Sequence, residues 1–174
     1  MFTSRYVCPL LVFSIGAFWA QSPGTALAEE DLNSLLEKRV ELKKGDRILF
    51  LGDSLTYLAG KEEPKKQVTK GYVRIVKETL RDKHRDKQIE VYWASTGGGT
   101  VYTLHSLLEK SVFPKKPTIV VIQIGCNDAR SKMTSEDFGQ GLEDLIDRLR
   151  KAKITVVQCT LTSVGEKHDG TNPH

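Results

Sequence analysis

The sequence has few of the features that mark specialised classes of protein. It contains 3 cysteines in 174 residues, too few for a disulfide framework. No internal repeat or low-complexity segment occurs, and hydrophobic and charged residues, at 39% and 28%, are ordinary for a globular chain. Neither a fibrous repeat nor disorder is therefore indicated, and the length suits one domain with a sizeable core.

Charge of one sign is not concentrated anywhere in the chain. The formal net charge is +4, and the densest basic stretch, residues 61–87, also carries acidic residues throughout. Such a mixture is typical of a solvated helix face and loop rather than of a nucleic-acid interface. No GxxxxGK[ST] loop or G-x-G-x-x-G fingerprint follows an expected strand, which argues against a nucleotide or flavin binder.

The first 28 residues differ in kind from the rest. Arg5 gives a positive start, Tyr6–Ala20 is almost entirely apolar, and Ala26-Leu27-Ala28 has the small-x-small pattern of a signal-peptidase site. The apolar run is short for a membrane span, and no second run of that kind follows. We expect a signal peptide over 1–28, a secreted or periplasmic protein beginning near Glu29, and no stable span after cleavage. An uncleaved anchor is the alternative.

Cys126 and Cys159, which remain after cleavage, fall in or beside apolar runs. A small buried thiol is the usual role of such a residue. Export would also permit a disulfide between them.

The remaining chain alternates between strand-like and helix-like segments. Residues 29–43 are expected to form a leading helix, Asp31–Leu42, and a linker. Strands are then predicted at Arg47–Leu51, Ile89–Ala94, Thr118–Ile124 and Ile154–Leu161, and helices at Gly71–His84, at Thr100–Lys110 and from Thr134 onward. Repeated βα units with right-handed crossovers predict an α/β fold with an open parallel sheet and helices on both sides.

Polar residues and glycines follow the first three predicted strands. Working residues in such sheets lie beyond the carboxyl ends of the strands, where Ser54 and Asn127 stand. Ser54 could attack an ester carbonyl while Asn127 donates to the resulting oxyanion. Alternatively, Ser54 caps a helix, Asn127 holds its own loop, and Gly97 to Gly99 form a simple turn.

Two motifs carry a family resemblance that covers about residues 44 to 174. Gly52-Asp53-Ser54-Leu55 and Gly125-Cys126-Asn127-Asp128 stand at matching strand ends, with Gly98 between them in sequence. The chain resembles the SGNH, or GDSL-type, hydrolase superfamily. This resemblance implies a flavodoxin-like three-layer α/β/α fold and hydrolysis of small esters or acylated carbohydrates without metal or cofactor.

The resemblance also implies roles for particular residues. Ser54 would be the nucleophile, and its N–H, the Gly98 N–H and the Asn127 side chain would form the oxyanion hole. Asp53, Gly99 and Asp128 would shape the loops and the substrate site.

The chain departs from the family pattern in two respects. Trp93 and Ser95 stand where many relatives have Asn and Gly, which affects the Gly98 donor. The family's D-x-x-H block, which supplies the general base, is not recognisable, and the last strand and helix are expected to be missing from the 44–174 domain.

None of the histidines fits that block; they are His84, His105, His168 and His174. The chain is therefore expected to be inactive as it stands. A non-catalytic carbohydrate-binding relative is the alternative, with Tyr57, Trp93 and Tyr102 available to stack on sugars.

Overall fold

The computed structural model describes residues 40–61 and 70–160, which belong, apart from Val40, to one compact unit, Glu41–His174. The predicted signal peptide, most of the leading helix, and His168 and His174 lie outside the described residues. Residues 40–42, which were predicted to end that helix, are not helical. None of the helices in 40–61 and 70–160 has both the length and the apolar character needed to cross a bilayer.

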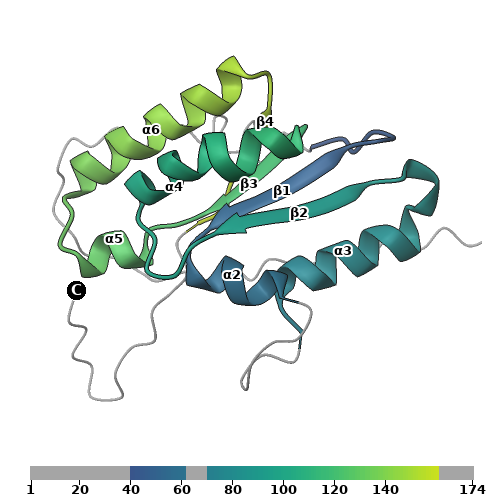
Figure 1. Cartoon of the computed structure of the whole chain (residues 1–174), viewed down its shortest axis with the longest axis horizontal. Coiled ribbons are helices and arrows are strands. Elements are labelled where there is room, and N and C mark those ends of the chain that lie inside the picture. The colour runs from purple at the N-terminus through teal and green to yellow at the C-terminus, as the bar shows by residue number, and fades with distance from the viewer. Residues whose placement is uncertain (1–39, 62–69, 161–174) are drawn as a thin grey trace, which may run out of the picture. The chain divides into compact units, whose positions relative to one another are not determined.

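The centre of this unit is a parallel sheet, as predicted (Figure 1). Its strands are β1 (Arg47–Gly52), β2 (Glu90–Ser95), β3 (Ile119–Gln123) and β4 (Thr155–Gln158). They lie in the order β2-β1-β3-β4, and every neighbouring pair is parallel. The first strand is therefore central, and β2 and β4 are the outer strands. The fourth strand is shorter at both ends than the sequence predicted.

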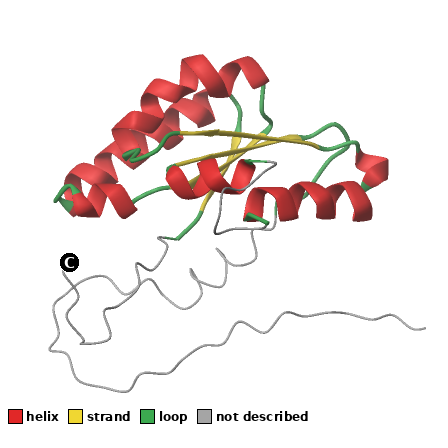
Figure 2. Ribbon diagram, turned by 60° about the horizontal axis from the view of Figure 1, so that its bottom comes forward, coloured by secondary structure: helices red, strands yellow, loops and turns green. Residues whose placement is uncertain are grey.

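Helices cover both faces of the sheet, which confirms the predicted three-layer arrangement (Figure 2). The main helices are α2 (Ser54–Gly60), α3 (Tyr72–Lys83), α4 (Val101–Leu107) and α6 (Ser135–Lys151). Helices α2 and α3 lie on one face, and α4 and α6 lie on the other (Figure 1).

Each face of the sheet has its own hydrophobic core because successive strand residues point to opposite sides. Ile48 and Phe50 of β1 belong to the cluster beneath α2 and α3. Leu49 and Leu51 belong to the cluster beneath α4 and α6, and neither has exposed surface. The central strand is thus buried on both faces, which explains its continuous apolar sequence.

Short irregular turns are the main departure from the predicted elements. The helix expected over Thr100–Lys110 ends at Leu107 and continues as a π-helical turn, Leu108–Val112, followed by a 3-10 turn, Phe113–Lys115. Pro114 in that turn cannot donate a backbone hydrogen bond and restricts the residue before it, so a regular helix cannot continue through it. Two further short elements, a 3-10 turn at Arg85–Lys87 and helix α5 (Cys126–Arg130), were not predicted.

Candidate active site

The three predicted loops meet at one edge of the sheet. In the strand register Gly52 of β1 is opposite both Ser95 of β2 and Gln123 of β3. The three strands therefore end at the same level, and the segments that follow them lie beside one another. One of these segments begins at Asp53-Ser54, another contains Gly98 and Gly99, and the third contains Asn127 and Asp128.

Ser54 is the first residue of α2 and is half-buried. Asp53, which is 1% exposed, is the N-cap of this helix, and its Oδ1 accepts a hydrogen bond of 2.9 Å from Leu55 N. The interpretation that Ser54 itself caps the helix is therefore wrong. The Ser54 side chain is not needed to hold the turn.

The glycine loop after β2 lies against this turn. A Cβ placed on Gly99 would lie 3.9 Å from Asp53 Cα and 2.7 Å from Thr96 Cγ2. Gly98 is exposed and has a φ of 68°, in the region that favours glycine. The loop thus presents exposed backbone beside the residue that precedes Ser54.

Asn127 joins the third segment to the glycine loop. Its Nδ2 donates a hydrogen bond of 2.9 Å to the Gly99 carbonyl oxygen. The side chain therefore holds the neighbouring loop and not its own loop, as one alternative had it. A side-chain amide has two N–H groups, so this bond engages only one of them.

Asp128 connects the same segment to α4. Its carboxylate is 2% exposed, and Oδ1 accepts a hydrogen bond of 2.8 Å from Val101 N, at the start of α4. Its other oxygen, Oδ2, has no partner among the described residues. Asp53 and Asp128 thus each bind the first turn of a helix, and the two helices lie on opposite faces of the sheet.

Neither described histidine lies where it could take a proton from Ser54. His84 caps the carboxyl end of α3 and is followed by the turn that leads into the amino end of β2, at the opposite edge of the sheet from Ser54. His105 Nε2 is 2.8 Å from the Gly141 carbonyl oxygen, and its Nδ1 is 3.3 Å from an Arg148 nitrogen. Both ring nitrogens of His105 therefore face α6.

The remaining candidates have different surroundings. Cys126 and Cys159 are half-buried thiols that are not joined in a disulfide, and burial raises the pKa of each. No group of side chains suited to holding a metal ion occurs within the residues described. Tyr57 and Tyr102 are 41% and 53% exposed, and Trp93 is 36% exposed.

Sequence analysis missed a buried polar contact beneath the Ser54 turn. Thr56 has no exposed surface, and its Oγ1 lies 2.6 Å from Tyr72 Oη and 3.4 Å from Gln123 Oε1. A Cβ on Gly52 would lie 2.1 Å from the same Oγ1, so glycine provides the space for it. The polar Gln123 within an otherwise apolar strand was the available signal.

Comparison with known proteins is consistent with this arrangement. A profile of the GDSL-like lipase/acylhydrolase family matches residues 50–173, which include all three segments of the candidate site. The chain belongs to this family. In this GDSL-family chain the two motifs lie at the carboxyl ends of β1 and β3.

Characterised proteins with related sequences include esterases that act on acetylated xylan. The GDSL-family chain is 32% identical over 94 residues to an acetylxylan esterase of Geobacillus stearothermophilus, an alignment that covers 51% of the chain and 42% of that enzyme. The crystal structure of the acetyl xylan esterase AlAXEase is 31% identical, with a TM-score of 0.61, and the match covers 72% of this chain and 63% of that one.

A crystal structure of the Geobacillus stearothermophilus acetylxylan esterase Axe2 has a TM-score of 0.59 at 24% identity and covers 68% of this chain and 61% of that one. At this identity the likeness shows the fold alone. The chain thus spans less than two thirds of the length of each of these relatives.

Proposed function

We propose that this protein is a serine ester hydrolase that removes acyl groups from carbohydrate. Ser54 Oγ would attack the ester carbonyl, form an acyl bond and release the alcohol, and water would then release the acid. The observation that supports this proposal best is the Asn127–Gly99 hydrogen bond. It joins two candidate oxyanion donors, the Asn127 amide and the glycine loop, beside the turn that carries Ser54.

The substrate class rests on the relatives. An acetylxylan esterase is 32% identical to 94 residues of the chain. The exported location that the first 28 residues predict would suit an extracellular carbohydrate. Export is part of the proposal. Sequencing the amino terminus of the released protein should give a start near Glu29, and a product that retains Met1 would contradict it.

The role of Ser54 can be tested without a histidine base. A cysteine at this position would be partly ionised at neutral pH and intrinsically nucleophilic. We expect Ser54→Cys to gain one acetyl group from p-nitrophenyl acetate, detected by intact mass. Adding Asn127→Ala should slow that acetylation by about 10²-fold, because one oxyanion donor is lost.

Two controls make this result specific. Ser54→Ala retains Cys126 and Cys159 and reports their background acetylation. Gln140→Ala removes an amide from the exposed surface of α6 and should leave the rate unchanged. If Ser54→Cys is acetylated no faster than Ser54→Ala, Ser54 is not at an acyl-accepting site, and the non-catalytic carbohydrate-binding alternative is preferred.

We also propose that the unmodified 174-residue chain turns over esters very slowly. Serine needs a base to take its proton, and both described histidines lie away from Ser54. Steady-state release of p-nitrophenol should therefore not exceed that of Ser54→Ala. Turnover that depends on Ser54 would refute this second proposal and leave the first in place.

A further inference from the structure

A groove separate from the candidate active site lies between α3 and the outer strand β2. It has a volume of about 570 Å³ and is bounded by α3, by β2 and by Gly60 at the end of α2. We call it the edge groove. Among the described strands β2 has a neighbour on one side only, so the groove runs along the edge of the described sheet.

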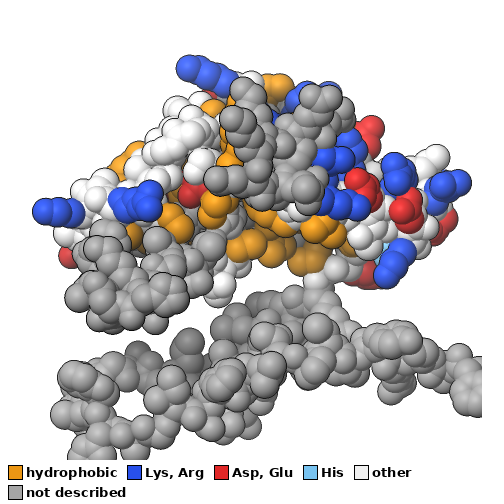
Figure 3. All heavy atoms as spheres, turned by 90° about the horizontal axis from the view of Figure 1, so that it is seen from below, with side chains coloured by type: hydrophobic (Ala, Val, Ile, Leu, Met, Phe, Trp, Pro, Cys, Tyr) orange, Lys and Arg blue, Asp and Glu red, His pale blue; other side chains and the backbone are white. Residues whose placement is uncertain are grey.

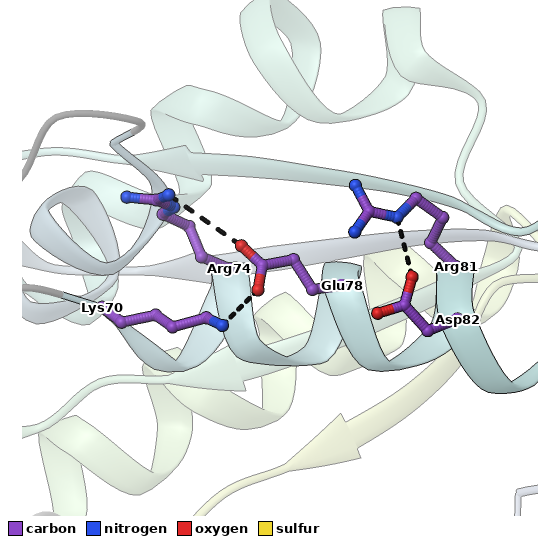
Figure 4. A network of polar contacts seen from close by, with 5 residues as sticks. All are labelled: Lys70, Arg74, Glu78, Arg81 and Asp82. Atoms are coloured by element: carbon purple, nitrogen blue, oxygen red, sulfur yellow. Dashed lines mark hydrogen bonds and ion pairs between the residues drawn. The ribbon is translucent and has the colours of Figure 1, made fainter.

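Three cations of α3 line the edge groove: Arg74, Lys77 and Arg81. Their spacing of three and four residues places them on one side of a helix. Figure 4 shows Arg74 and Arg81 projecting from the same side of α3. Seen from below, basic and acidic side chains gather at one end of the unit, next to exposed hydrophobic side chains (Figure 3).

The carboxylates of the edge groove already have partners. Glu78 forms ion pairs with Lys70 and, at 3.9 Å, with Arg74 (Figure 4). Glu90 Oε2 accepts a hydrogen bond of 2.6 Å from Tyr92 Oη. The three cations that line the edge groove, Arg74, Lys77 and Arg81, thus exceed its two carboxylates by one positive charge.

Two of the cations keep donors for a ligand. Arg81 uses Nε to bind Asp82 at 3.0 Å, and within the described part of the chain its two terminal nitrogens form no hydrogen bond. Lys77 has no ion-pair partner among the same residues. Lys77 and Arg81 are about 6 Å apart along the helix axis, and a guanidinium group can bind a carboxylate through two parallel hydrogen bonds.

Trp93 adds an aromatic surface to the edge groove. Its ring packs on Gly60, where a Cβ would lie 2.4 Å from Trp93 Cδ2, and the side chain is still 36% exposed. The ring is thus held against backbone and partly open to solvent. Such an amphipathic ring suits one face of a sugar.

We propose that the edge groove binds an oligosaccharide that carries carboxylate groups, such as uronic acid units. Lys77 and Arg81 bind the carboxylate, and Trp93 packs against a sugar ring. The choice of a sugar rests on the proposed function, whereas the charge of the ligand rests on the groove alone. Helix α2 runs from Ser54 to Gly60, which lines the edge groove, a distance of about 9 Å along the helix axis. A polysaccharide chain bound in the edge groove would therefore also lie near the Ser54 loop.

The position of Trp93 provides a direct measurement. The chain has 2 tryptophans, Trp19 and Trp93, so Trp19→Phe in the full chain leaves Trp93 as the sole fluorophore. We expect its emission to change on titration with a xylo-oligosaccharide that bears glucuronic acid. The unsubstituted oligosaccharide of the same length should bind about ten-fold more weakly, because it lacks the charge-assisted hydrogen bonds.

Matched variants test which residues are responsible. Lys77→Ala and Arg81→Ala should each weaken binding of the acidic oligosaccharide about ten-fold, whereas Lys83→Ala, an exposed cation of α3 outside the groove, should not. Equal binding of the two oligosaccharides, no loss in either groove variant, or tighter binding of a poly-glutamate peptide would overturn the proposal. Ser54→Ala should bind normally, which separates this result from the test of hydrolysis.

Discussion

At the scale of single residues, the candidate site depends on polar side chains that were not recognisable as functional. Thr56, Tyr72 and Gln123 form a buried contact between α2, the start of α3 and the end of β3. They lie directly behind the turn that carries Ser54. We infer that this contact positions the first turn of α2.

The substitution Tyr72→Phe tests this contact, and its effect on the free energy of unfolding should depend on pH. Loss of the Tyr72–Thr56 hydrogen bond should lower the free energy of unfolding by about 1 kcal/mol at neutral pH. Burial raises the pKa of Tyr72 above its ordinary value. The folded state therefore favours the neutral phenol, and this stabilisation is lost as pH rises through the raised pKa.

The wild-type advantage over Tyr72→Phe should consequently shrink above about pH 10. Urea unfolding at neutral and alkaline pH measures both quantities. An unchanged difference across this range would show that the hydroxyl does not titrate with folding.

At the scale of elements, the loop between β2 and α4 is joined to two neighbours. Gly99 accepts the Asn127 hydrogen bond, and the Thr96 side chain leaves no space for a Cβ at position 99. Gly99→Ala should therefore destabilise the fold by about 1–3 kcal/mol through overpacking. Gly97→Ala is the matched control in thermal unfolding, since nothing lies within 4 Å of its Cβ position. Equal stability of the two variants would contradict the close packing of this loop.

The helices and strands also show how much of the fold and of the candidate site could be predicted from the sequence. Apolar periodicity identified all the strands of the described sheet, and the motif residues that follow them lie at one edge of it, as expected of strands that run parallel. Helix α5 was missed because Cys126–Arg130 is too short to show a periodic pattern. Contacts such as Asn127 with Gly99 join loops 28 positions apart, and a pattern of nearby residues contains no information about such pairs.

At the scale of the whole unit, the sheet separates two helical layers, and loops that lead into both of them lie beside each other at the candidate site. Helix α2, which begins at Ser54, belongs to one layer, and α4, which Asp128 binds, belongs to the other. Within the second layer α4 and α6 are in direct contact, since a Cβ on Gly141 would lie 2.9 Å from Val101 Cγ1. Two substitutions at contacting positions within one layer should therefore have non-additive effects on the free energy of unfolding, whereas two substitutions in different layers should have additive effects.

A double-mutant cycle can measure this separation. Val101→Ala alone leaves a cavity, and Gly141→Ala alone forces two side chains together, so each should destabilise the protein. Together they should cost less than their sum by about 0.5–3 kcal/mol, because the shortened side chain makes room for the new methyl group. Val73→Ala, in the α3 layer, should instead add to Gly141→Ala within about 0.5 kcal/mol. Similar coupling in both pairs would show that the layers respond as one, and that the parts of the site contributed by α2 and α4 cannot be altered independently.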